Sequence, residues 1–150
     1  MSFEEKVTWV SGVVTVFVVG WYAWVVGGRL GEVPVVDIAY QRPLLIAVGA
    51  MIVLTILGTI GMAIGAAIKA EITGEGSVDD IDRKDERDAQ IDARGDRVAF
   101  YVSSALMVGV MAMAMLEVAH FWIANGVFAA FVVGGLVSTG VKLTAYRRGF

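Results

Sequence analysis

Four long apolar runs dominate the sequence. They cover residues 7–26, 44–68, 98–117 and 121–141. Each run is about 20 residues long or longer, which is the length that an α-helix needs to cross the hydrocarbon core of a bilayer. Backbone polar groups in lipid must be satisfied within the protein, so such runs form helices even where valine is frequent. The sequence therefore predicts an all-α membrane protein with four transmembrane helices in one domain, residues 1–150.

The composition agrees with a membrane environment. Of 150 residues, 57% are hydrophobic and 18% are charged, and the mean hydropathy is +0.73. A soluble domain of this size has too much surface for its volume to hide so much apolar area. The sequence contains no cysteine, which excludes disulfides and thiolate metal sites. Its few, scattered basic residues do not form a nucleic-acid footprint.

A single long polar segment, residues 71–97, divides the chain into two apolar halves. It holds ten acidic and five basic residues. Between Val78 and Gly95 it contains neither glycine nor proline, and charges of opposite sign recur at helical spacing. We expect a short helix here from about Asp79 to Ala93, either separate or continuous with the third span across Gly95.

The arrangement of lysine and arginine predicts the orientation. With the N-terminus inside, ten of the basic residues lie on the inner side, and only Arg29 and Arg42 lie outside. Three residues separate the third and fourth spans, so we expect two antiparallel hairpins, with both termini and the charged segment in the cytoplasm. The C-terminal tail combines basic and aromatic residues, which suits anionic lipid headgroups.

Small residues recur at every fourth position in two spans, a pattern that lets helix backbones approach closely in lipid. Both packing within one subunit and a homo-oligomer interface are consistent with this pattern. The second span contains one such pair and the fourth span a longer series: Gly61 and Gly65; Gly126, Ala130, Gly134 and Ser138.

The third span carries a methionine at every fourth position, Met107, Met111 and Met115. Thioethers are soft ligands that suit Cu(I), and Glu117 and His120 follow at the predicted outer end of the same helix. These five residues are candidates for a metal site or an ion pathway. The alternatives are that methionine serves as an adaptable packing residue and that Glu117 and His120 form an interfacial pair.

The segments DERDAQIDARGDR, HFWIAN and YRRGF together resemble a group of small uncharacterised bacterial four-helix inner-membrane proteins. That group carries a DERD-type motif before its second helical hairpin. The resemblance covers the C-terminal half and implies a bacterial inner-membrane location. We expect the motif to tie the second and third helices together or to bind a partner, and these positions carry it: Asp85, Glu86, Arg87, Asp88, Ile91 and Gly95.

Two functions are consistent with these features. The first is a non-enzymatic accessory or interaction protein whose charged cytoplasmic segment meets a cytoplasmic or membrane protein. The second is a small oligomeric channel or transporter for a proton or a metal ion. The sequence shows no nucleophile–base set, phosphate-binding loop or metalloprotease spacing, so we expect no enzyme activity and no cofactor. The expected partners are the lipid bilayer and further copies of the chain.

Overall fold

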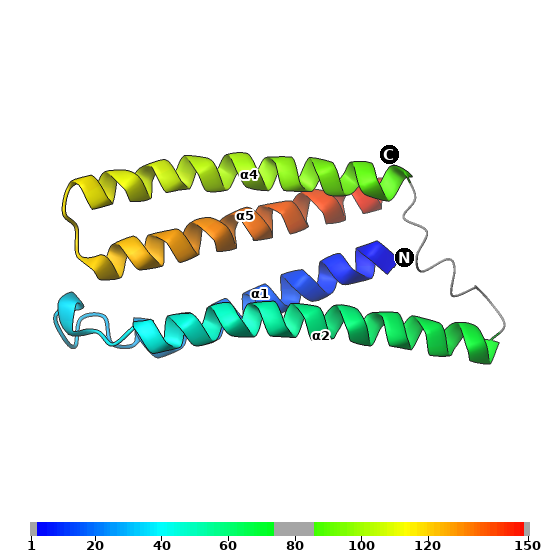
Figure 1. Cartoon of the computed structure of the whole chain (residues 1–150), viewed down its shortest axis with the longest axis horizontal. Helices are drawn as coiled ribbons and strands as arrows, with labels where there is room; N and C mark the ends of the chain where they lie inside the picture. Colours follow the sequence, from blue (N-terminus) through cyan, green and yellow to red (C-terminus); the bar gives the residue numbers. More distant parts are fainter. Residues whose placement is uncertain (1–2, 74–85, 149–150) are drawn as a thin grey trace.

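The computed structural model describes residues 3–73 and 86–148, and in this part of the chain helices joined by short connections are present without strands (Figure 1). Its four long helices are α1 (Phe3–Gly27), α2 (Gln41–Thr73), α4 (Glu86–Met115) and α5 (His120–Arg148). A short 3-10 helix, η1 (Val35–Asp37), lies in the connection between α1 and α2. The predicted all-α architecture is confirmed.

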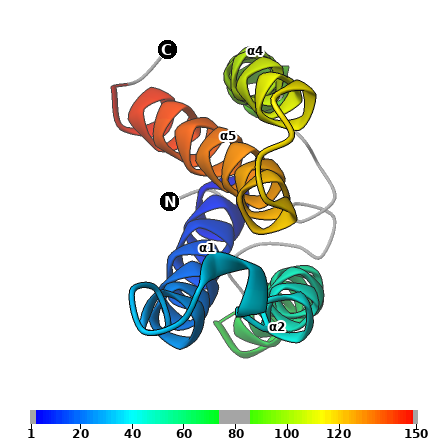
Figure 2. The ribbon, with the colours of Figure 1, turned by 90° about the vertical axis from the view of Figure 1, so that its left-hand side faces the viewer.

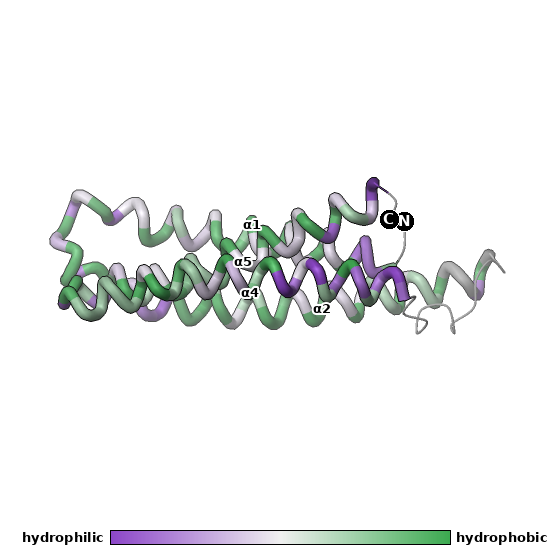
Figure 3. Tube along the Cα trace, turned by 90° about the horizontal axis from the view of Figure 1, so that it is seen from above, coloured by the Kyte–Doolittle hydropathy of each residue, from purple (hydrophilic) through white to green (hydrophobic). Residues whose placement is uncertain are grey.

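Each of the four main helices is long and apolar enough to cross a membrane. This arrangement is that of a multi-pass membrane protein, as the sequence predicts. Figure 3 shows that the middle of the bundle is mostly apolar, and that hydrophilic residues gather at the end where α4 begins and α5 finishes. We call this the polar end of the molecule.

The helices lie in an open row rather than in a closed ring. In the row, α4 packs on α5, α5 on α1, and α1 on α2 (Figure 2). A larger share of α1 and α5 is buried than of α2 and α4. The first and last helices of the chain thus form the centre of the molecule, and the contact between them joins its two halves.

The main apolar core lies toward the end that carries η1. Val18, Tyr22 and Val26 of α1 meet Ala47 of α2 and Phe121 of α5 there. The connection between α1 and α2 closes this end, because Ile38 is buried in the same core and the ring of Tyr40 packs edge-on against Phe121, with 5.2 Å between ring centroids.

The helix boundaries differ from the predicted ones in α4. This helix begins at Glu86 and runs through Gly95 to Met115 without interruption. Residues 86–93 therefore belong to the same helix as the third span, whereas residues 79–85 of the expected short helix lie outside the described residues. At its other end α4 stops two residues before Glu117, whose positive φ of 54° turns the chain toward α5.

Candidate functional site

At the polar end, a lysine of α5 bridges two carboxylates of α4. Lys142 Nζ lies 3.2 Å from Asp92 Oδ1 and 2.9 Å from Asp96 Oδ1. The side chains of Lys142 and Asp92 are only 17% and 19% exposed, whereas that of Asp96 is 69% exposed. The attraction to Asp92 is therefore less screened by water than the attraction to Asp96. These ion pairs join α4 firmly to α5.

Gly95 makes this bridge possible. A Cβ atom at this position would lie 2.6 Å from both Cγ and Cε of Lys142 and 3.0 Å from Ser138 Oγ. The lysine side chain therefore crosses α4 directly over the glycine to reach the two carboxylates on either side. Ser138 Oγ also donates a hydrogen bond to Asp96 Oδ1 at 3.4 Å. One turn earlier in α4, Ile91 is also buried.

The other positions of the DERD motif lie on the first turn of α4, apart from Asp85, which is outside the described residues. Glu86 and Arg87 are exposed, and Asp88 is half-buried. We expected Arg87 and the neighbouring acids to connect the second and third helices. The two ion pairs of Lys142 connect α4 to α5, and the expected connection through Arg87 stays a prediction.

The polar end also brings α1 into contact with α5. The Arg147 guanidinium lies 5.7 Å from the ring centroid of Trp9, over its face, in the geometry of a cation–π interaction. Tyr146 projects from the same turn of α5, and its Oη is buried without a hydrogen-bond partner among the described residues. Burial raises the pKa of this phenol, and the carboxylates of Asp88 and Asp92 raise it further. The phenol therefore stays neutral.

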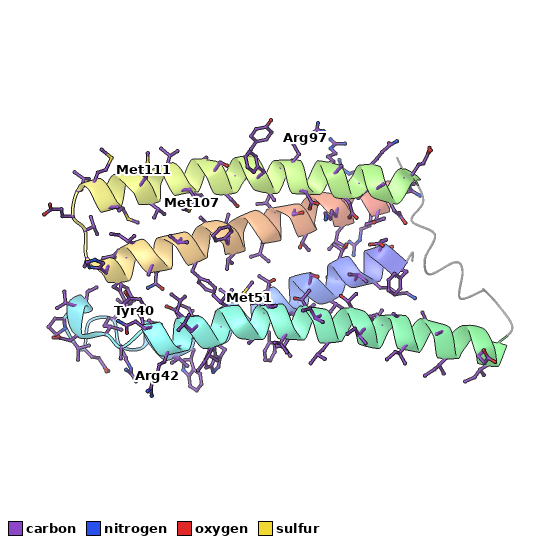
Figure 4. The ribbon with its side chains drawn as sticks, in the orientation of Figure 1. Tyr40, Arg42, Met51, Arg97, Met107 and Met111 are labelled. Carbon is purple, nitrogen blue, oxygen red and sulfur yellow. The ribbon has the colours of Figure 1, made fainter. Side chains whose placement is uncertain are left out.

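The methionines of the predicted stripe differ in how far they are exposed. Met107 is half-buried, but Met111 and Met115 are 58% and 78% exposed, and Figure 4 shows Met111 on the side of α4 away from the other helices. Glu117 and His120 are exposed in and beside the connection to α5. Among the described residues, no three histidine or carboxylate side chains are grouped closely enough to hold a metal ion.

The two small-residue patterns have different surroundings. A Cβ at Gly126 would meet Met113 and Val110 of α4, and a Cβ at Gly134 would overlap Ser103. Ala130 is buried beside them, and its carbonyl oxygen accepts a hydrogen bond from Ser103 Oγ at 3.0 Å.

The small residues of α5 therefore serve packing within one subunit, in the contact with α4. Gly61 and Gly65 of α2, by contrast, have no atom within 4 Å of an added Cβ.

Sequence reasoning missed one polar contact inside the bundle. Tyr22 Oη donates a hydrogen bond of 2.7 Å to Asn125 Oδ1, and Asn125 Nδ2 donates one of 2.8 Å to the Phe121 carbonyl. The signal was present, since Asn125 is the only amide side chain in the four apolar runs. Such a residue needs a partner in lipid, and the tyrosine supplies it.

Comparisons of the chain with protein-family models, with curated proteins and with solved structures find no match.

Proposed function

We propose that this protein is a non-enzymatic accessory or interaction protein of the bacterial inner membrane, and that the polar end of α4 binds a partner protein. In this proposal the four helices form two antiparallel transmembrane hairpins. Both termini and the charged segment 71–97 face the cytoplasm.

The observation that carries the proposal is the length and continuity of α4. Its 30 residues span about 45 Å at 1.5 Å per residue, whereas the hydrocarbon core is about 30 Å thick. The charged residues occupy its first three turns, before the apolar part begins at Val98. Three charged turns can therefore stand outside the hydrocarbon as a rigid extension of a membrane helix.

Packing leaves one face of this extension open. Ile91 and Gly95 face α5, and Lys142 holds the helix there. Glu86, Gln90, Ala93 and Arg97 follow one another at intervals of three or four residues and are all exposed. We call these four residues the outer face of α4. A fixed helix that presents such a face is suited to docking a protein, because binding then does not cost the conformational entropy of ordering a loose segment.

Site-specific photocrosslinking in native membranes tests the docking. A photoreactive amino acid at Gln90 should give a discrete protein adduct, which the charge reversals Arg87→Glu and Arg97→Glu should weaken. The same amino acid at Val108, an exposed apolar position of the same helix, is the matched control. An adduct at Gln90 whose yield is unchanged by both charge reversals would count against the proposal, and so would the absence of any adduct.

Cysteine labelling tests the orientation, because the natural chain contains no cysteine and single cysteines need no further background changes. A membrane-impermeant maleimide should label Glu32→Cys in intact spheroplasts. It should label Glu86→Cys only after the membrane is opened. The reverse pattern would overturn the proposed orientation.

Transport is the alternative function, and it would have to use more than one subunit. The exposed side chains of Met111 and Met115 could line a pathway only if a second copy covered them. Ion flux through proteoliposomes that disappears in the Glu117→Gln variant would favour transport over docking.

A further inference from the structure

A groove opens between α4 and α5 beside the polar end. It has a volume of about 640 Å³, within the range of roughly 300–1,000 Å³ that is usual for sites that take drug-sized molecules. Arg94 and Val98 form the α4 wall, and Val137, Val141, Thr144 and Arg148 are the main residues of the α5 wall. These two walls contain two guanidinium groups and no carboxylate.

The groove changes from apolar to cationic along its length. Val137, Val141, Thr144 and Arg148 are three or four residues apart and form one stripe along α5. The α4 wall runs in the opposite direction (Figure 1), so Arg94 lies at the same end as Arg148, and Val98 lies toward the valines. The result is an apolar floor with two arginines at its mouth.

Two acidic residues of α4 at this end lie outside the groove. Asp92 and Asp96 meet Lys142, and neither lines the groove. A second hollow of about 300 Å³ continues around α5 from Thr144 and Arg148 to Arg147 and Trp9. The groove mouth and this adjoining hollow together carry three arginines from two helices and an aromatic ring, a combination that suits an anionic headgroup at a membrane surface.

From this arrangement we infer that the groove binds one anionic phospholipid: the arginines Arg94 and Arg148 hold the headgroup phosphate, and an acyl chain lies along Val98, Val137 and Val141. Arginine suits phosphate because its planar fork donates two parallel hydrogen bonds. The apolar floor favours a lipid over a free phosphate, because a free phosphate has no apolar part that could pack against the three valines. The inference depends on the membrane location but not on the docking of a partner.

Native mass spectrometry of the purified protein in gentle detergent tests the site. Phosphatidylglycerol should bind at least fivefold more tightly than phosphatidylcholine with the same acyl chains. Arg148→Gln and Arg94→Gln should each weaken the binding of phosphatidylglycerol by about fivefold, the factor expected for one basic residue at a membrane surface. Arg97→Gln removes the same charge from an exposed position outside the groove, and should change binding by less than twofold.

A steric variant separates a built groove from general attraction of anions to a basic end. Val141→Trp fills the floor without changing a charge and should abolish the preference for phosphatidylglycerol. Val133→Trp adds the same ring at an exposed position of α5 and should preserve it. An unchanged melting temperature identifies folded variants, and if Val141→Trp does not fold, the arginine variants decide alone.

Three results would overturn the inference. The first is equal binding of the two lipids, and the second is equal effects of Arg148→Gln and Arg97→Gln. In the third, inorganic phosphate at millimolar concentration displaces phosphatidylglycerol from the wild type, and the Val141→Trp variant binds phosphatidylglycerol as tightly as the wild type does. That result would indicate a site for a free anion. Crosslinking at Gln90 reports on the partner separately, so failure of the lipid site and failure of docking are distinguishable.

Discussion

Two tyrosines whose hydroxyl groups lie inside the bundle have opposite hydrogen-bonding situations. Tyr22 donates to Asn125 across the contact between α1 and α5, whereas the buried Oη of Tyr146 has no partner among the described residues. A hydrogen bond between membrane helices contributes about 0.6 kcal/mol on average and up to about 1.7. A buried hydroxyl without a partner costs free energy instead.

We therefore predict opposite effects of the same substitution. Tyr22→Phe should lower the free energy of unfolding by about 0.5–1.5 kcal/mol, and Tyr146→Phe should leave it unchanged or raise it by up to about 1 kcal/mol. Denaturant unfolding in mixed detergent micelles measures both. Equal losses in the two variants would contradict the assignment of partners.

Tyr146 also predicts a dependence on alkaline pH. Burial and nearby carboxylates raise the pKa of its phenol above the ordinary value of 10.0, so the folded state holds this proton more tightly than the unfolded state. Stability from this group is complete below pH 10 and declines as the pH rises above it. Tyr146→Phe should reduce the loss of stability between pH 9 and pH 11, as followed by thermal unfolding at each pH.

Lys142 gives a third prediction at the scale of single residues. Lys142→Met keeps the length of the side chain but leaves Asp92, which is mostly buried, without this cation. We expect a loss of about 1–3 kcal/mol in unfolding free energy. Asp96→Asn removes the exposed half of the bridge and should cost less than about 1 kcal/mol. If Asp96→Asn were the more damaging change, Asp92 would not be the main partner.

At the scale of helices, the contact between α4 and α5 depends on the absence of side chains on α5. Ser103 and the Ala99 carbonyl occupy the space beside Gly134, whereas nothing lies within 4 Å of a Cβ at Gly135. Two adjacent glycines in one helix thus have different surroundings, and they offer a matched test of the contact.

Gly134→Ala should destabilise the protein by about 1–3 kcal/mol because the added methyl overlaps Ser103 and forces the helices apart. Gly135→Ala should be neutral or stabilising by up to about 1 kcal/mol, since alanine favours a helix over glycine. Thermal unfolding in detergent measures both changes. Similar melting temperatures for the two variants would show that the helices do not pack at Gly134 as described.

At the scale of the whole molecule, the open row of helices leaves most of α2 uncovered. Gly61 and Gly65 face away from the rest of the chain, and close approach of another helix is what such a pair allows. The proposed homo-oligomer would therefore use α2, because the small residues of α5 are already covered by α4.

Gly65→Leu should shift the purified protein toward the monomer by at least tenfold in dissociation constant, as measured by native mass spectrometry across protein concentrations. Gly49→Leu provides the matched control, since Gly49 also has open space around it but lies 12 and 16 residues from the pair, on a different side of the helix. A monomeric wild type at every concentration would remove this interface from the proposal.

The length of each apolar run by itself determined that the described part of the chain has four membrane-length helices, because in lipid an unbroken apolar segment must satisfy its own backbone. The charged run and its helical spacing likewise predicted a helix from about Asp79 to Ala93, of which residues 86–93 are described and belong to α4. Both conclusions depend on local properties of the chain.

Only the tertiary structure decided which faces meet. In a membrane helix the lipid-facing side and the packed side are both apolar, so the hydrophobic pattern does not show how the helix is rotated. The sequence could therefore not distinguish the covered pattern at Gly134 from the uncovered one at Gly65. It also could not show that Lys142 crosses Gly95 to reach Asp92, since that bridge depends on the register between two antiparallel helices.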